Sequence, residues 1–122
     1  MMNKEKICAD ILDCPVQHTL AVIGGKWKVA ILYYLVDKTF RFGELKRKIP
    51  NITQKMLTQQ LRELEDHGLV HREVYAEVPP RVEYSLTEFG KTLSPVLSTI
   101  CQWGSLHRKT IEKNVSAKKL VA

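Results

Sequence analysis

The most distinctive chemistry of this 122-residue chain lies between Thr53 and His67, where polar and apolar side chains recur at helical spacing. At about 100° per residue, the two kinds of side chain fall on opposite faces of a helix. The polar face consists of Lys55, Thr58, Gln59 and Arg62, and the apolar face of Met56, Leu57, Leu61 and Leu64. Arg and Lys can hydrogen-bond guanine in a DNA major groove, Gln can hydrogen-bond adenine, and Thr can serve either role. The polar face therefore predicts base recognition, although an ordinary solvent-exposed helix has a similar composition.

The residues before this helix predict a tight turn that follows another helix. The segment from Gly43 to Ile49 has helical spacing and ends in a Lys-Arg-Lys run. Pro50 then stops this helix, because proline lacks an amide donor and forces the preceding residue out of helical geometry. Asn51 tolerates left-handed backbone geometry, and Thr53 can cap the next helix. Two helices joined in this way form a helix-turn-helix.

A β-hairpin is expected directly after the second helix. Strand patterns at about residues 70–75 and 81–86 are separated by a loop with two prolines, and Arg41 with Phe42 could form a short additional strand. The stiff loop should hold Arg81 beside the second helix, where it could contact phosphates or the minor groove. These elements predict a fold that is mainly α with a small β-hairpin, a winged helix-turn-helix with helical dimerisation extensions at both ends.

Charge is distributed unevenly along these elements. From Lys38 to Arg62, seven Lys and Arg residues accompany one acid, Glu44, whereas five acids lie between Glu63 and Glu77. DNA phosphates would attract the first group and repel the second, so the second helix should enter a groove by its Thr53 end. The formal charge of +6 and the pI near 9.3 agree with double-stranded DNA as the partner, although composition alone does not require it. Lys48 is a further candidate phosphate contact.

Helices are also expected on both sides of this region. A helix over residues 15–23 begins with a proline, which suits the first turn, and two glycines end it. A core helix over about residues 26–36 follows. After the hairpin, Thr87 can start another helical region. A break is expected at Ser94, which would cap the next helix, and Pro95, which would take its first position.

An apolar stripe continues beyond this break at intervals of three and four residues, on a chain end with little core of its own to cover. Burial in a homodimer is the simplest outcome, and packing on the first helix of the same chain is the alternative. The residues expected at the dimer interface are Val16, Leu20, Leu97, Ile100, Trp103 and His107. The chain should form a single domain of residues 1–122. It divides into a flexible lead (1–13), a DNA-binding core (26–86), dimerisation helices (87–113) and a tail (114–122).

Several other function classes lack the residues that they need. There is no glycine-rich phosphate loop, GxSxG motif or recognisable catalytic constellation, so neither an enzyme nor a cofactor is expected. His67 and His71 lie four residues apart, but Gly68 should end the helix between them, which argues against a metal site. There is no apolar run of about 18 residues and no secretory signal, so we expect a cytoplasmic protein without a membrane partner.

The cysteines argue for a reduced protein with one candidate reactive thiol. Cys8, Cys14 and Cys101 cannot all pair within one chain and form no CxxC motif, so neither a disulfide framework nor a structural zinc site is expected. Cys14 precedes Pro15 at an expected helix start, where free amides and the helix dipole stabilise a thiolate. This position is typical of a reactive thiol, and a packed, inert thiol is the alternative.

Three strings of the sequence resemble the HxlR-type transcriptional regulators, MarR-like winged-helix proteins of bacteria. They are CPVQHTLAVIGGKWKVAIL, RFGELKRKIPNITQKMLTQQLRELEDHGLV and VYAEVPPRVEYSLTEFG, and the resemblance covers about residues 14–104. The joint occurrence of GGKW, KMLTQQLRELE and VPPRVEYSLT is highly specific. One departure is Asn51, at a turn position where the family usually has glycine.

The resemblance implies a dimeric DNA-binding repressor or activator, and members often respond to electrophiles, aldehydes or oxidants. Such a dimer would bind a pseudo-palindromic operator. Family roles carried onto the matching positions give Arg81 on the wing and, on the recognition helix, Thr53, Gln54, Lys55, Thr58, Gln59 and Arg62. Lys26 and Lys28 are candidates for contact with phosphates, and simple surface charges beside a buried Trp27 are the alternative. Some members use the cysteine that corresponds to Cys14 as a sensor of oxidants or quinones. A noncovalent small-molecule effector and a winged-helix module that binds proteins are the alternatives.

Overall fold

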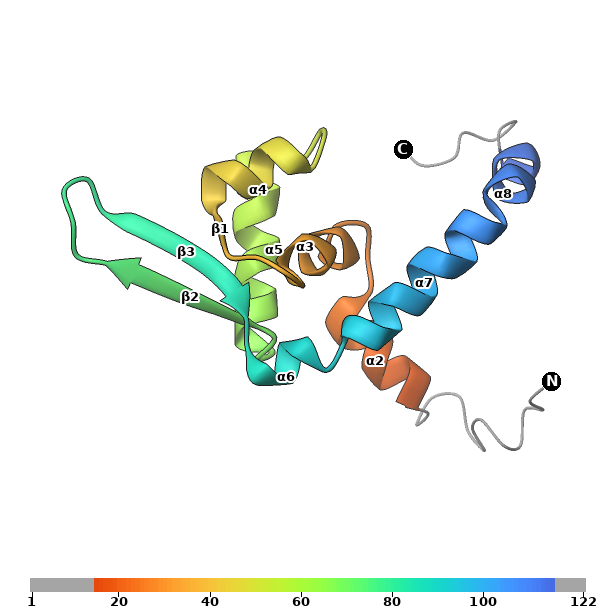
Figure 1. The fold of residues 1–122 in the computed structure, drawn as a ribbon, viewed down its shortest axis with the longest axis horizontal. Coiled ribbons are helices and arrows are strands. Elements are labelled where there is room, and N and C mark those ends of the chain that lie inside the picture. Colours follow the sequence, from red (N-terminus) through yellow and green to blue (C-terminus); the bar gives the residue numbers. More distant parts are fainter. Residues whose placement is uncertain (1–14, 116–122) are drawn as a thin grey trace. The chain divides into compact units, whose positions relative to one another are not determined.

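Helices alternate with a small antiparallel sheet in the computed structural model of the chain, which describes residues 15–115 (Figure 1). In chain order the elements are α2 (Pro15–Ile23), α3 (Lys28–Leu35), β1 (Phe40–Arg41), α4 (Phe42–Lys48), α5 (Gln54–Asp66), β2 (Val70–Tyr75), β3 (Arg81–Leu86), α6 (Glu88–Lys91), α7 (Ser94–Leu106) and α8 (Arg108–Val115). A first compact unit ends at Lys91 and a second begins at Thr92. The boundary between them therefore follows α6, whereas the sequence division was drawn before it, at residue 87.

Three antiparallel strands form the sheet of the first unit, in the order β1-β3-β2. The hairpin register pairs Val70 with Leu86 and Tyr75 with Arg81. β1 joins the other edge of β3 through Phe40 and the residue after it. Both hairpin strands have the predicted bounds. The short strand lies one residue earlier than expected, because the residue after it already begins α4.

Apolar side chains from three helices and the sheet form most of the core of the first unit. The leucines at positions 57, 61 and 64 of α5 are all fully buried, as the sequence predicted, whereas Met56 is only half-buried. The other buried side chains include Ile31, Leu32 and Leu35 of α3, Leu45 of α4, and Phe40, Val70, Tyr84 and Leu86 of the sheet. Each fully buried aliphatic side chain contributes about 1.5–3 kcal/mol, so these residues decide which face of α5 points outward.

Local hydrogen bonds and backbone geometry set the ends of α5. The turn before it passes through Asn51, whose φ of +69° is the left-handed geometry expected for asparagine there. Thr53 Oγ1 accepts a hydrogen bond from the Met56 amide at 3.0 Å, which confirms the predicted cap. Beyond the other end, Gly68 has a φ of +78°, which favours glycine and terminates the helix. The turn of the helix-turn-helix is therefore built as the sequence predicted.

Three other helix starts can be compared with the predicted boundaries and caps. α3 begins at Lys28, two residues later than expected. Thr87 caps α6 as predicted, since its Oγ1 accepts a hydrogen bond from the Gly90 amide at 2.8 Å. Ser94 does not cap α7. It is the first residue inside the helix, and Leu93 precedes it without a side-chain hydrogen bond to the helix. The expected break is nevertheless present, between α6 and α7.

The second unit consists of α7 and α8. The apolar stripe that the sequence predicted as continuous is interrupted at His107, which ends α7. α8 is short and carries exposed cations in Arg108, Lys109 and Lys113. Within residues 15–115, no helix is long and apolar enough to span a bilayer.

Candidate nucleic-acid interface

The outward face of α5 carries the side chains predicted to contact bases. An open depression along this face is lined by Gln54, Lys55, Thr58, Gln59, Arg62 and Glu63. The structure thus brings five of the six predicted recognition positions together, and Thr53 lies immediately before them as the cap. Lys55, Gln59 and Arg62 are exposed, whereas Thr58 is half-buried. Glu63 was not predicted in this set and adds a carboxylate to an otherwise cationic and amide-rich face.

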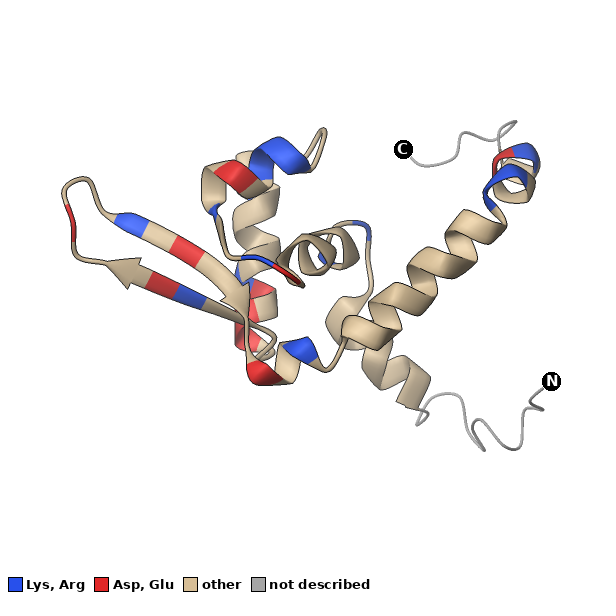
Figure 2. Ribbon diagram, in the orientation of Figure 1, with Lys and Arg blue, Asp and Glu red and all other residues tan. Residues whose placement is uncertain are grey.

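α4 presents a concentration of positive charge directly before the turn. Its last three residues, Lys46, Arg47 and Lys48, are all exposed (Figure 2). At its first turn the Arg41 amide donates a hydrogen bond to Glu44 Oε1 at 2.8 Å, and this bond lowers the pKa of the Glu44 carboxyl. An anion at the amino end of a helix and cations at its carboxyl end both complement the helix dipole. The three cations at the end of α4 therefore favour the helix itself, and they are exposed for contacts with phosphates.

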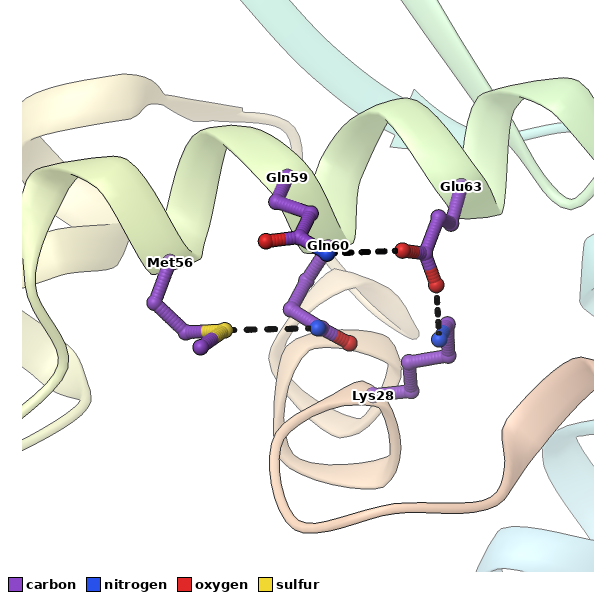
Figure 3. Close-up of polar contacts among 5 residues, drawn as sticks. All are labelled: Lys28, Met56, Gln59, Gln60 and Glu63. Carbon is purple, nitrogen blue, oxygen red and sulfur yellow. Dashed lines mark hydrogen bonds and ion pairs between the residues drawn. The ribbon is translucent and has the colours of Figure 1, made fainter.

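Lys28 is not available as the predicted phosphate contact. It is 8% exposed, and its Nζ lies 2.5 Å from Glu63 Oε1 (Figure 3). Glu63 Oε2 accepts a second hydrogen bond, from Gln59 Nε2 at 3.3 Å. The hydrogen bond from Lys28 is the main cause that lowers the pKa of Glu63, followed by the bond from Gln59. Because its ammonium is buried and paired, we remove Lys28 from the set of phosphate contacts.

A cation that the sequence reading missed, Arg72, lies beside the recognition helix. A second depression is lined by Thr58, Leu61, Arg62, Glu65, Arg72 and Tyr84. Arg72 is exposed and pairs across the hairpin with Tyr84. Residues 70, 72 and 74 share one face of β2, since successive side chains alternate across a strand. The position of Arg72 two residues after the buried Val70 was the available signal.

Arg81 does not lie where the sequence reading placed it. By the same alternation, Arg81 and Glu83 lie on the sheet face opposite to Tyr84, the residue that lines the depression beside α5. The Arg81 guanidinium pairs with Glu77 at 3.0 Å and Glu83 at 3.3 Å, and lies 4.0 Å from the centroid of the Tyr75 ring. These contacts hold Arg81 within the wing. The expected position beside the recognition helix was wrong because it ignored which face of β3 carries Arg81.

The remaining candidates lie outside both depressions. Lys26 is exposed, with its ammonium 4.7 Å from the centroid of the Trp27 ring. His71 Nε2 lies 2.9 Å from Glu73 Oε1, and His67 ends α5. Over the range that the structure describes, no group of three or more His, Cys, Asp and Glu side chains could hold a metal ion.

Residues 22–112 match the family described as HxlR-like helix-turn-helix. The chain belongs to this family. It is 54% identical over 110 residues to the HTH-type transcriptional regulator YdeP of Bacillus subtilis (strain 168), which covers 90% of this chain and 86% of YdeP. The solved structure of the redox regulator HypR in its reduced form is 56% identical, with a TM-score of 0.78 over 81% of this chain and 98% of that chain. Reduced YodB from B. subtilis is 38% identical, with a TM-score of 0.67 over 75% of this chain and 90% of that chain.

Membership makes this HxlR-like protein a transcriptional regulator of the helix-turn-helix type, whose partner is DNA, and not an enzyme. The family and the fold class that the sequence predicted are confirmed. The solved structures that resemble the chain are of transcriptional regulators, including members of the MarR family.

Groups of two or more exposed apolar side chains lie on α2 and on α7 of the HxlR-like protein. They are Val16 and Leu20 on α2, and Val96, Ile100, Trp103 and Leu106 on α7. Leu106 was not predicted at a dimer interface, yet it is 79% exposed and lies three residues after Trp103. Leu97, which was predicted there, is already buried in the single chain. The rings of Trp103 and His107 are in contact, with centroids 5.0 Å apart.

Two cysteines of the HxlR-like protein bear on thiol chemistry, Cys14 and Cys101. Cys14, the candidate sensor, lies outside the described residues, immediately before the first residue of α2 in the sequence. Cys101 is a free, exposed thiol on α7. Because Cys101 is exposed, any test of thiol chemistry at Cys14 must control for it.

Proposed function

We propose that this HxlR-like protein is a homodimer that binds a pseudo-palindromic operator through two copies of α5. One observation carries the proposal: cationic and amide side chains line the outward face of α5, while the opposite face is buried in the core. An α-helix fits the major groove, and Arg, Lys and Gln can hydrogen-bond base edges there. The cations at the end of α4 would add phosphate contacts, which position the protein without reading sequence.

The dimer is supported by the apolar side chains exposed on α2 and α7. Exposed groups of apolar side chains commonly mark interaction sites, and identical subunits most often associate with two-fold symmetry. Two recognition helices in such a dimer would contact half-sites about 34–36 Å apart, one turn of DNA. An operator with two-fold pseudo-symmetry follows from this arrangement.

Selection from a duplex library with a randomised centre tests the DNA-binding part. The wild type should enrich a pseudo-palindrome. Its affinity should fall steeply as salt rises, because Lys and Arg side chains that bind phosphates release the counterions condensed there. Arg62→Ala should weaken binding and relax the preference at one position in each half-site. Arg108→Ala, which removes an exposed arginine from α8, is the matched control. Equal behaviour of the two variants would count against α5 as the recognition helix.

We also propose that the protein acts as a repressor that oxidants or electrophiles release through Cys14. A thiol at the start of a helix is stabilised as the thiolate, the reactive form, and Cys14 immediately precedes α2. Similar proteins support this part: HypR is described as a redox regulator and is known in oxidised and reduced forms, and YodB in reduced and diamide-treated forms.

Gel-shift affinity before and after diamide tests the redox part. Wild type and Cys101→Ser should both lose affinity for the selected sequence after treatment, whereas Cys14→Ser should keep it. If Cys14→Ser loses affinity as much as the wild type, Cys14 is not the sensor. If only Cys101→Ser becomes insensitive, the exposed thiol of α7 is the reactive one.

A further inference from the structure

The amide of Gln59 is held by a network that reaches from the outward face of α5 into the core (Figure 3). Gln59 Nε2 donates to one oxygen of Glu63, and Lys28 Nζ donates to the other. A glutamine amide can turn over, which exchanges a hydrogen-bond acceptor for a donor at the same place. Whatever orients the Gln59 amide therefore affects which bases it can contact.

The chemistry of Glu63 permits only one orientation of this amide. An ionised carboxylate accepts hydrogen bonds and cannot donate them. The Lys28 ammonium beside it favours the ionised form, consistent with the lowered pKa of Glu63. Gln59 must then turn its nitrogen toward Glu63 and its oxygen away, which is the arrangement in Figure 3.

The other side of the network supports the same geometry. Lys28 is the first residue of α3, and its burial confines the ammonium to the neighbourhood of Glu63. The pair is part-buried, with Lys28 buried and Glu63 half-exposed, so it contributes little net stability, but the buried Lys28 side chain has few alternative positions. The next amide on α5 does not compete for Glu63, because Gln60 Nε2 donates to the Met56 sulfur at 3.4 Å.

We propose that Lys28 and Glu63 are positioning residues that set the base preference of Gln59. With its nitrogen engaged, Gln59 presents its carbonyl oxygen to the DNA and accepts a hydrogen bond from a base. In the major groove the donors are adenine N6 and cytosine N4, whereas guanine and thymine place acceptors at the corresponding positions. Gln59 then selects adenine or cytosine. The inference rests on the proposed function, because it requires α5 to enter the major groove.

The test compares base preferences in the same library selection. Gln59→Leu identifies the base pair that Gln59 contacts. Lys28→Met/Glu63→Gln releases the amide, leaves the net charge unchanged, and avoids an unpaired buried charge, which would destabilise the fold. Lys91→Met/Glu88→Gln removes an exposed Lys–Glu pair from α6 and is the matched control. Thermal melting establishes that each variant is folded.

On one strand at the Gln59 position, the wild type should prefer adenine and cytosine over guanine and thymine by about two- to tenfold, the range for a single hydrogen bond, with the complement on the other strand. Lys28→Met/Glu63→Gln should lose most of that preference and keep those at other positions, while the α6 control keeps all of them. Should the double variant fail to fold, Glu63→Asp replaces it. This change retains a charge for Lys28 but shortens the side chain by a methylene, and the same loss is expected.

Three results would overturn the proposal. They are a wild-type preference at the Gln59 position that does not separate adenine and cytosine from guanine and thymine on either strand, no change at any position in Gln59→Leu, and an unaltered preference in a folded Lys28→Met/Glu63→Gln protein. A wild type that enriches no sequence at all would instead refute the proposed function. The two failures are therefore distinguishable in one experiment.

Discussion

Adjacent residues of α5 should separate folding stability from DNA binding. Leu61 is 1% exposed, whereas its neighbour Arg62 is exposed, because adjacent residues are about 100° apart on a helix and only Leu61 faces the core. Leu61→Ala leaves a void at a fully packed position, and should lower the free energy of unfolding by about 2–5 kcal/mol. Arg62→Ala removes a side chain from the surface, and should change that free energy by less than about 0.5 kcal/mol.

Thermal unfolding at one fixed protein concentration measures the first effect. For a chain of this size, 1 kcal/mol moves the melting temperature by about 4 °C, so Leu61→Ala should melt roughly 8–20 °C below the wild type. Titration with the selected duplex, at a temperature where both variants are folded, measures the second. Arg62→Ala should bind about tenfold more weakly, equivalent to about 1.4 kcal/mol and within the range of a specific base contact. Leu61→Ala should bind like the wild type.

We expect Leu61→Ala to lose stability without losing DNA affinity, and Arg62→Ala to lose DNA affinity without losing stability. A departure from this pattern would refute the reasoning. If Arg62→Ala binds DNA like the wild type but melts several degrees lower, the outward face of α5 is structural. If Leu61→Ala melts like the wild type, α5 does not pack through the leucine face described above. Either result would remove the physical basis for assigning the outward face to DNA.

Three further outcomes follow from individual residues. Asn51 has a φ of +69°, so Asn51→Gly should raise the free energy of unfolding and Asn51→Ala should lower it by about 1 kcal/mol, measured by urea denaturation. Trp103→Ala on α7 should shift the protein toward monomer in sedimentation, whereas Val78→Ala, at a fully exposed loop position, should not. The hydrogen bond that the Arg41 backbone amide donates holds the pKa of the Glu44 carboxyl below its ordinary 4.5. The stabilisation from this bond is therefore present above pH 4.5 and is lost as pH falls through the folded pKa. Glu44→Gln should therefore lose less stability than the wild type on acidification below about pH 4.5, in urea unfolding at a series of pH values.

Local patterns predicted much of the first unit. The hairpin bounds, the Thr53 cap, the left-handed Asn51 and the leucine face of α5 depend on residues a few positions apart. Periodicity, capping and turn chemistry act over that same range. The Ser94 cap was wrong even so, because the backbone of α7 starts its first turn at the serine itself. A residue that can cap a helix indicates that a helix can begin near it. It does not indicate which residue is the first of the helix.

Contacts between distant residues escaped the sequence reading. Lys28 was assigned to phosphates with the family resemblance, but it pairs with Glu63, 35 positions along the chain. Arg72 was overlooked because its alternation with Val70 indicates only a sheet face, and the packing of α5 beside that face is a contact between distant residues. Arg81 was placed beside α5 because the reading considered the stiffness of the loop and not the face of β3.

The sequence by itself determined the family, the helix-turn-helix with its wing, and the side chains of α5 that could meet DNA. Those features are encoded in spacing, and spacing along one helix or strand is independent of the rest of the fold. The tertiary structure decided which charges remain available. Packing α3 against α5 buries Lys28 against Glu63, and strand pairing turns Arg72 toward the recognition helix and Arg81 away from it. A charge becomes buried, paired or free only when segments remote in the chain come together.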